Sequence, residues 1–157
     1  METIRGRTPH ALDSIELAAR LANHQRILLD LGTGDGKFAF HHARTFPSQF
    51  VIGVDACREN LREYSRAKLP NLLYLIAGAQ ELPRELNGLA SHITINFPWG
   101  SLLESLLNGD PRLIRGLETV SRSAASIDIR LNGGALTEAG TTLENGAWTI
   151  HNNLLRA

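Results

Sequence analysis

Residues Arg26–Phe46, RILLDLGTGDGKFAFHHARTF, decide the fold. The segment opens with Arg26–Leu31, a short apolar run without regular polar alternation, which is typical of a strand buried on both faces. Glycines then occupy every second position from Gly32 to Gly36 and break the run. The following residues, Lys37–Phe46, predict a helix that ends before a proline. A buried strand, a glycine turn and a helix in this order form the first half of a β-α-β unit.

The same alternation of strand and helix continues along the chain. Short apolar runs predict four more strands, at Phe50–Asp55, Leu72–Ala77, His92–Phe97 and Ala124–Leu131. Helical spacing and capping residues predict helices at Thr8–Asn23, Cys57–Lys68, Leu102–Leu107 and Leu113–Val120. This order predicts an α/β fold: a mostly parallel sheet with right-handed crossovers and helices on both faces.

The last predicted strand, Ala124–Leu131, differs from the others. Its isoleucines and leucine alternate with serine, aspartate and arginine. Such alternation means that one face is wet or poorly covered, as at the edge of a sheet. Residues 132–157 contain Asn-Gly-Gly and no clear period, which predicts a loop and one helix or strand.

Length and composition exclude several classes of protein. The 157 residues, 43% of them apolar and 20% charged, fit one globular domain. No apolar run approaches the roughly 20 residues of a membrane span, and no secretory signal is visible at the N-terminus. A single cysteine, Cys57, excludes an internal disulfide, and a cytoplasmic protein is expected. The six histidines lack metal-ligand spacing, so no metal is expected.

The charge balance argues against a nucleic-acid partner, because 16 basic and 16 acidic residues give a net charge of zero. A local basic patch is compatible with that total. Arg5 and Arg7 form a small basic arm near the N-terminus, and Lys68 precedes the third predicted strand. These three residues are the candidates for contact with RNA.

The glycine turn carries the strongest functional signal. Glycines let a backbone approach a ligand closely, and ligands of open α/β sheets bind at the carboxyl edge of the strands. The dinucleotide fingerprint G-x-G-x-x-G fails because Lys37 stands at its third glycine, and no phosphate-loop G-K-[ST] follows. The remaining pattern is D-x-G-x-G-x-G, with Asp30 two residues before the first glycine. A carboxylate there suits an ammonium group, which S-adenosylmethionine carries beside its sulfonium; the alternative is a turn that binds nothing.

Two further loops lie at the same predicted edge. Asp55 ends the second strand, where a carboxylate can accept hydrogen bonds from both ribose hydroxyls or cap the next helix. Ala79, Gln80 and Glu81 follow the third strand, where the adenine of a nucleoside is expected. The side chain of Gln80 or Glu81 is predicted to reach the adenine amino group; the alternative is a solvated loop.

The second strong signal is the segment Asn96, Phe97, Pro98 and Trp99 at the end of the fourth predicted strand. This segment is predicted to face the sulfonium methyl. An aromatic face such as that of Trp99 can stack on a nucleobase taken out of its helix. The alternative is that Trp99 is a core aromatic residue.

Four stretches together resemble a known family. The stretches LDLGTGDGKFAFHHAR, VIGVDACRENL, LPNLLYLIAGAQELP and FPWGSLLESLL are similar to the aminoglycoside-resistance 16S ribosomal RNA adenine-N1 methyltransferases of the Kam type. The resemblance runs from about residue 26 to 131. It implies a Rossmann-like, class I S-adenosylmethionine-dependent methyltransferase fold. It also implies an enzyme that transfers a methyl group to N1 of a decoding-site adenine in the 16S rRNA of the 30S subunit and so confers aminoglycoside resistance.

The resemblance also implies roles for individual residues. Trp99 resembles the first of two family tryptophans that sandwich the flipped adenine, and the second role is not carried over to Trp148. Alignment of substrate and cofactor, rather than a general base, is expected to supply most of the rate. The residues expected to bind S-adenosylmethionine, and its product S-adenosylhomocysteine, are Asp30, Gly32, Thr33, Gly34, Asp35, Gly36, Asp55, Ala79, Gln80 and Glu81.

Family members continue beyond the length of this chain, so the sheet is expected to lack the last two strands of the family fold. The chain is therefore divided into an N-terminal extension and helix (1–25), a cofactor-binding core (26–131) and a poorly defined tail (132–157) of a single methyltransferase domain. A monomer or a dimer paired along the last strand is expected. Two other functions remain open: a small-molecule methyltransferase, and a non-catalytic relic or fragment that binds the cofactor.

Overall fold

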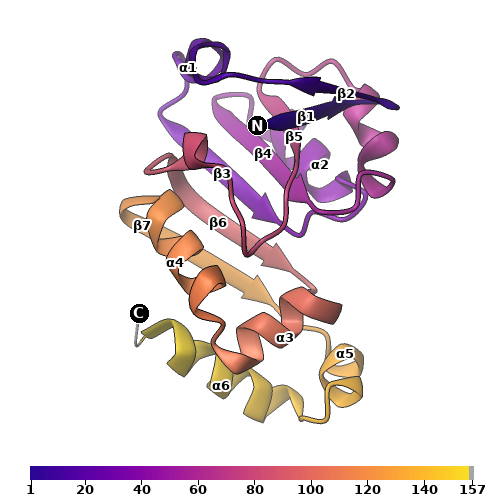
Figure 1. Cartoon of the computed structure of the whole chain (residues 1–157), viewed down its shortest axis with the longest axis vertical. Coiled ribbons are helices and arrows are strands. Elements are labelled where there is room, and N and C mark those ends of the chain that lie inside the picture. The colour runs from indigo at the N-terminus through magenta and orange to yellow at the C-terminus, as the bar shows by residue number, and fades with distance from the viewer. Residues whose placement is uncertain (156–157) are drawn as a thin grey trace.

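A seven-stranded, mostly parallel sheet runs through the computed structural model, which describes residues 1–155 (Figure 1). The strand order is β2-β1-β5-β4-β3-β6-β7. Five parallel strands form its main part, and they confirm the five predicted from the sequence. They are β3 (Arg26–Leu31), β4 (Gln49–Asp55), β5 (Leu72–Ile76), β6 (Ala90–Asn96) and β7 (Ser121–Arg130). The order of strand and helix along the chain confirms the α/β, Rossmann-like prediction.

Helices cover the two faces of this sheet unequally. On one face, α2 (Lys37–Thr45) packs on β4 and β5. Figure 1 shows α3 (Gly100–Asn108) and α4 (Pro111–Val120) on the opposite face, over β6 and β7. Alternate residues of β4 divide between the two faces: Phe50 belongs to the larger core cluster and Val51 to the smaller one beneath α2. Burial on both faces explains why β4 reads as a continuous apolar run.

The N-terminus folds differently from the prediction of a helix starting at Thr8. Thr8–Ala11 forms β2, which pairs antiparallel with β1 (Glu2–Arg5) as a hairpin at the β5 edge of the sheet. Pro9 is compatible with this position because an edge strand does not need every backbone N–H. The helix α1 (Ser14–Leu21) begins later, where the Asp13 carboxylate accepts a hydrogen bond of 2.8 Å from the backbone N–H of Glu16.

The predicted helix at Cys57–Lys68 is also wrong. The segment forms two short 3₁₀ turns, Asn60–Arg62 and Tyr64–Arg66. Its side chains are engaged by the rest of the fold: the Ser65 hydroxyl accepts a hydrogen bond of 2.9 Å from the backbone N–H of Gly6, and Leu61 is buried in the core cluster beneath α2. These tertiary contacts override the helical spacing of the sequence.

Two helices follow β7, where the sequence predicted one helix or strand. They are α5 (Gly133–Glu138) and α6 (Leu143–Leu155), and each contributes a buried side chain, Leu136 and Ile150, to the larger core cluster. As far as residue 155, no strand follows β7, which therefore forms an edge of the sheet as predicted. Among residues 1–155, no helix has the length and apolar character that crossing a membrane requires.

The glycine turn between β3 and α2 is confined on one side by Tyr74 of β5. Gly36 has a φ of 82°, and a Cβ added there would lie 2.5 Å from a carbon of the Tyr74 ring. The Tyr74 hydroxyl donates a hydrogen bond of 2.6 Å to the carbonyl oxygen of Gly36. Burial raises the pKa of this phenol, so the hydroxyl keeps the proton that it donates. Gly34 has a φ of 61° but nothing within 4 Å of an added Cβ.

Two substitutions in this turn separate backbone strain from steric clash. Gly36→Ala combines a positive φ with contact against Tyr74, and we expect it to lower the free energy of unfolding by about 2–4 kcal/mol. Gly34→Ala has the strain without the clash and should cost about 1–2 kcal/mol. Urea unfolding followed by circular dichroism measures both losses. Equal losses in the two variants would show that the Tyr74 ring does not confine the turn.

Candidate functional site

A cavity of about 500 Å³ opens at the carboxyl ends of β3, β4, β5 and β6. We call it the strand-end cavity. Four loops bring together residues that are as far apart in the chain as Gly32 and Leu102. The side chains and backbone that line it come from Gly32–Asp35, Val54–Cys57, Asn60, Ala77–Gln80 and Asn96–Leu102. Its volume lies in the range of roughly 300–1,000 Å³ that is usual for small-molecule sites.

Backbone hydrogen bonds hold the glycine turn at the floor of this cavity. The N–H groups of Gly32 and Thr33 both donate to the carbonyl oxygen of Val54, over 2.9 and 3.0 Å. The N–H of Gly34 donates to Oδ2 of Asp55 over 2.9 Å, and Oδ1 of Asp55 accepts from the N–H of Cys57 over 2.8 Å. Asp55 thus connects the glycine turn to the loop after β4, and it also lines the cavity.

Asp30 lies behind the cavity wall and is almost fully buried, with 1% of its surface exposed. Its Oδ1 accepts hydrogen bonds from the Thr94 hydroxyl, over 2.7 Å, and from Nδ2 of Asn96, over 2.9 Å. Its Oδ2 accepts from the Thr33 hydroxyl over 2.5 Å. Burial raises the pKa of the Asp30 carboxyl above its ordinary value, and these three hydrogen bonds oppose that rise. The direct contact of Asp30 with an ammonium group stays a prediction.

The segment Asn96–Trp99 forms one wall of the cavity. Phe97 has a positive φ of 52°, an uncommon conformation for a residue with a side chain. Pro98 is buried, whereas Trp99 has 78% of its surface exposed. The alternative that Trp99 is a core aromatic residue is therefore wrong, and its indole is accessible beside the cavity.

Of the three residues predicted near an adenine, Ala79 and Gln80 line the strand-end cavity. Nε2 of Gln80 donates a hydrogen bond of 2.8 Å to the Ser105 hydroxyl. Glu81 is exposed and lines a different depression, beside α4. Asp35 lines the strand-end cavity, whereas Gly36 is outside it, against Tyr74.

The candidate RNA-contacting residues lie elsewhere. Arg5 and Lys68 line a second, larger cavity of about 610 Å³, whose other lining residues come from the N-terminal hairpin, α1, the segment before β5 and β5 itself. Arg7 is exposed in the turn of that hairpin. None of the three lines the strand-end cavity, and the larger cavity is lined neither by the glycine turn nor by Asp55 or the segment 96–99. We therefore place the candidate site in the smaller of the two cavities.

Sequence reasoning missed two features of the site. Gly100, Ser101 and Leu102 line the cavity at the start of α3, and their position directly after Trp99 was the available signal. Arg130 contacts Asn96 from β7, and only the strand register reveals that contact. Within residues 1–155, no group of three or more histidine, cysteine, aspartate or glutamate side chains is placed to hold a metal.

Comparison with known proteins decides the family. A family model described as NpmA, 16S rRNA (adenine(1408)-N(1))-methyltransferase, matches residues 2–156. The chain belongs to this family. It is 34% identical over 140 residues to the 16S rRNA (adenine(1408)-N(1))-methyltransferase of Streptoalloteichus tenebrarius, an alignment that covers 84% of this chain and 64% of that relative. The chain thus spans less than two thirds of this relative's length.

Solved structures agree with that family and with the fold. The 16S rRNA methyltransferase KamB is similar over 100% of this chain and 80% of its own, with a TM-score of 0.89 and 32% identity. A W203A mutant of the 16S rRNA (adenine(1408)-N(1))-methyltransferase from Catenulisporales acidiphilia, solved with its cosubstrate SAM, is similar over 99% of this chain and 78% of its own. Its TM-score is 0.88 and its identity 26%. These likenesses confirm the class I methyltransferase fold that the family resemblance implied.

The buried carboxylate of Asp30 makes a prediction about stability and pH. Because its pKa is raised in the folded state, the folded chain takes up this proton more readily than the unfolded chain. The contribution of Asp30 to stability is therefore greatest below its ordinary pKa and is lost as the pH rises through the folded pKa. Asp30→Asn lacks this titration, so the stability of the wild type relative to the variant should fall as the pH rises from the ordinary pKa of an aspartate, about 4, through the folded pKa.

Urea unfolding of both proteins across this pH range measures the difference, in which contributions of the other carboxylates cancel. A difference in the free energy of unfolding that is independent of pH would contradict the raised pKa of Asp30.

Proposed function

We propose that this chain binds S-adenosylmethionine in the strand-end cavity and methylates N1 of adenine 1408 in the 16S rRNA of the 30S subunit. Membership in the family and the likeness to a relative solved with its cosubstrate SAM support the proposal. The single observation that carries it is the exposed indole of Trp99 on the rim of a cavity formed by the glycine turn. The 30S substrate would place the activity in the cytoplasm.

The residues that line the cavity fit this cofactor. Gly34 leaves open space where a side chain would stand, so the backbone can approach a ligand. Asp55 uses one lone pair of each carboxylate oxygen on backbone N–H groups, which leaves acceptor capacity for two ribose hydroxyls. Ala79 and Gln80 line the cavity from the loop after β5, where the adenine is proposed to bind. Thr33 is held in place by Asp30, and both are proposed to order the turn near the methionine portion.

The proposed chemistry needs alignment more than proton transfer. S-adenosylmethionine supplies a methyl group that its sulfonium already activates. N1 of adenine carries a lone pair, so no side chain has to remove a proton before the attack. The chain's contribution is then to stack the base on Trp99 and hold it beside the cavity, with Asn96, Phe97 and Pro98 shaping that wall. Arg5, Arg7 and Lys68 are proposed to contact RNA phosphates away from the reacting base.

Substitution of Trp99 tests the proposal. In a tritium-transfer assay on isolated 30S subunits, Trp99→Ala should lower turnover by about 5- to 150-fold, because one base–aromatic stack is worth roughly 1–3 kcal/mol. Affinity for S-adenosylhomocysteine, measured by calorimetry, should change less than about twofold. Trp99→Phe should recover part of the loss. Trp148 on α6 is similarly exposed and does not line the cavity, so Trp148→Ala is the matched control and should leave turnover unchanged.

Three results would contradict the proposal. Equal loss of cofactor affinity and turnover in Trp99→Ala would mean that this residue supports the cavity rather than the base. Cofactor binding without transfer to 30S subunits would favour a chain that binds the cofactor and modifies nothing. Transfer to small heterocyclic amines but not to 30S subunits would favour a small-molecule methyltransferase.

A further inference from the structure

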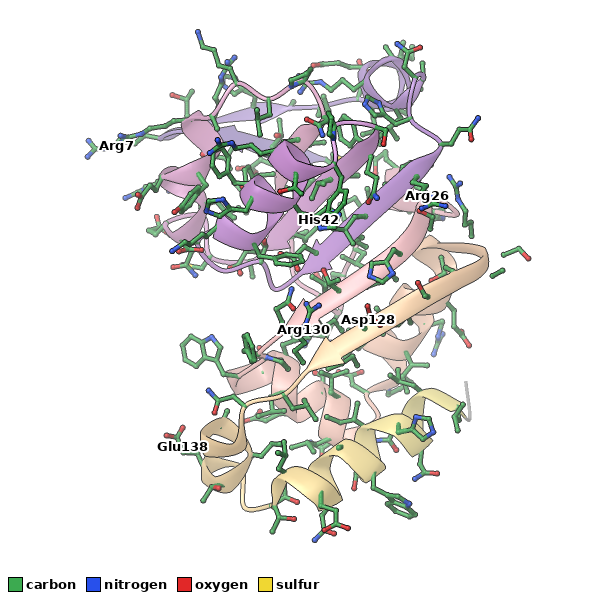
Figure 2. All side chains as sticks on the ribbon, turned by 180° about the vertical axis from the view of Figure 1, so that it is seen from behind. Arg7, Arg26, His42, Asp128, Arg130 and Glu138 are labelled. Atoms are coloured by element: carbon green, nitrogen blue, oxygen red, sulfur yellow. The ribbon has the colours of Figure 1, made fainter. Side chains whose placement is uncertain are left out.

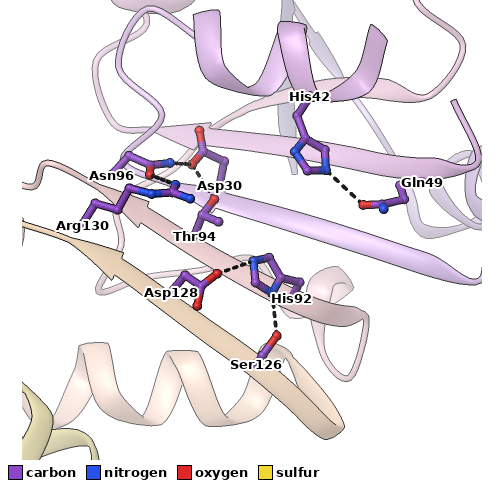
Figure 3. Close-up of polar contacts among 9 residues, drawn as sticks. All are labelled: Asp30, His42, Gln49, His92, Thr94, Asn96, Ser126, Asp128 and Arg130. Atoms are coloured by element: carbon purple, nitrogen blue, oxygen red, sulfur yellow. Dashed lines mark hydrogen bonds and ion pairs between the residues drawn. The ribbon is translucent and has the colours of Figure 1, made fainter. Parts of the chain in front are cut away.

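Arg130 contacts the Asn96–Trp99 wall of the cavity at two places. Its Nη1 donates a hydrogen bond of 2.5 Å to Oδ1 of Asn96, as Figure 3 shows. Its backbone carbonyl oxygen accepts a hydrogen bond of 2.7 Å from the N–H of Phe97. Both contacts come from the last residue of β7, which pairs with Asn96 in the parallel register of β6 and β7. The edge strand therefore fixes the point at which the wall leaves the sheet.

The side-chain contact sets the direction of the Asn96 amide. Oδ1 of Asp30 accepts the hydrogen bond from Nδ2 of Asn96, so the NH₂ group of Asn96 faces the carboxyl group. The amide oxygen then points to the opposite side, where the Arg130 guanidinium, which only donates, completes the pair. A continuous series of hydrogen bonds thus runs from Arg130 through Asn96 and Asp30 to Thr33 of the glycine turn.

The backbone contact supports a strained residue. The positive φ of Phe97 is disfavoured for a residue with a Cβ and persists where surrounding contacts enforce it. The hydrogen bond from its N–H to Arg130 supplies such a contact on the side of β7. Phe97 itself is 56% exposed, so burial of its side chain contributes little to holding this conformation.

The Arg130 side chain lies on the polar face of β6 and β7. Figure 2, which views the molecule from the side opposite to Figure 1, has this face toward the viewer, with Asp128 and Arg130 labelled and α2 covering only the neighbouring strands. The guanidinium carbon of Arg130 lies 5.7 Å from the centroid of the Phe38 ring on α2, which limits its motion. Asp128, two residues earlier, pairs with His92 over 3.2 Å and not with Arg130. The side-chain contacts of Arg130 among the described residues are therefore those with Asn96 and Phe38.

We propose that Arg130 is a positioning residue for methyl transfer: it orders Asn96 and Phe97 so that Trp99 stands at the cavity in the orientation that receives the base. This inference rests on the proposed function. It gives the edge strand β7 a role in the site, although no residue of β7 lines the cavity. A direct contact of the Arg130 guanidinium with an RNA phosphate is the competing role, and the test separates the two.

The experiment uses Trp148→Phe as the background, so that Trp99 is the single tryptophan of the full chain. Arg130→Met removes the donor to Asn96 and keeps a long side chain, whereas Arg130→Lys keeps one donor. Arg122→Met is the matched control, because Arg122 lies on the same strand and bonds the carbonyl oxygen of Gln25, over 2.7 Å, instead of the cavity wall. Acrylamide quenching and anisotropy of Trp99 are measured without RNA, and kcat and KM for 30S subunits are measured by tritium transfer.

Arg130→Met should change the quenching and lower the anisotropy of Trp99, and it should lower kcat about tenfold or more with KM changed less than about twofold. Arg130→Lys should recover part of both effects, and Arg122→Met should alter neither. In a Trp99→Ala background, Arg130→Met should cost much less, because the residue that it positions is gone.

Unchanged fluorescence of Trp99 in Arg130→Met would overturn the inference. A raised KM with unchanged kcat would overturn it in favour of an RNA contact. Failure of the proposed function would give a different result from failure of this inference. The parent chain would then show no tritium transfer, while the fluorescence comparison would still report on the role of Arg130.

Discussion

The buried carboxylate of Asp30 is the interaction on which the candidate site depends. It accepts hydrogen bonds from the glycine turn through Thr33 and from β6 through Thr94 and Asn96. A buried carboxylate is costly unless its lone pairs are satisfied, and each donor that binds it would also lose a partner if the carboxylate were removed. The three contacts therefore stabilise one another. They hold two parts of the cavity that lie about 60 residues apart in the chain in a single geometry.

From this carboxylate the site extends in two directions. Toward β4 and β5, the glycine turn is held by Val54, Asp55 and Tyr74, and each of these contacts a different point of its backbone. Toward β7, Asn96 accepts a hydrogen bond from Arg130, and the strained Phe97 is the next residue in the chain. Trp99 is left exposed at the end of this supported segment. Such an arrangement suits a reaction in which the methyl group is already activated and the protein contributes orientation.

The sequence predicted the parts of the molecule that local chemistry determines. Apolar runs located all five parallel strands, and glycine spacing located the turn, because burial and positive φ restrict the residue types at those positions. The predictions failed where contacts distant in sequence decide the outcome. Thr8–Ala11 pairs with β1 instead of starting a helix, and Ser65 bonds Gly6 within 3₁₀ turns.

The same distinction holds for the site. The motif residues Asp55 and Trp99 line the cavity as their positions after strands suggested. Arg130 was absent from the predicted site, because its contact with Asn96 depends on the register of β6 against β7 and spans 34 residues. Glu81 was predicted near an adenine because its turn follows the third strand, but Glu81 lines the depression beside α4 and not the strand-end cavity. A one-residue step in a turn changes the direction of a side chain in a way that spacing alone does not reveal.

Titration calorimetry of S-adenosylhomocysteine into the 157-residue chain, with Asp55→Asn as the comparison, tests the central claim most directly. The claim is that the strand-end cavity is a nucleoside site ordered by the Asp30 network. It predicts one site per chain, and an affinity about 10- to 100-fold lower in Asp55→Asn, since hydrogen bonds to a charged group contribute roughly 1.5–3 kcal/mol. Absence of binding by the parent chain, or equal affinity of the two proteins, would contradict it.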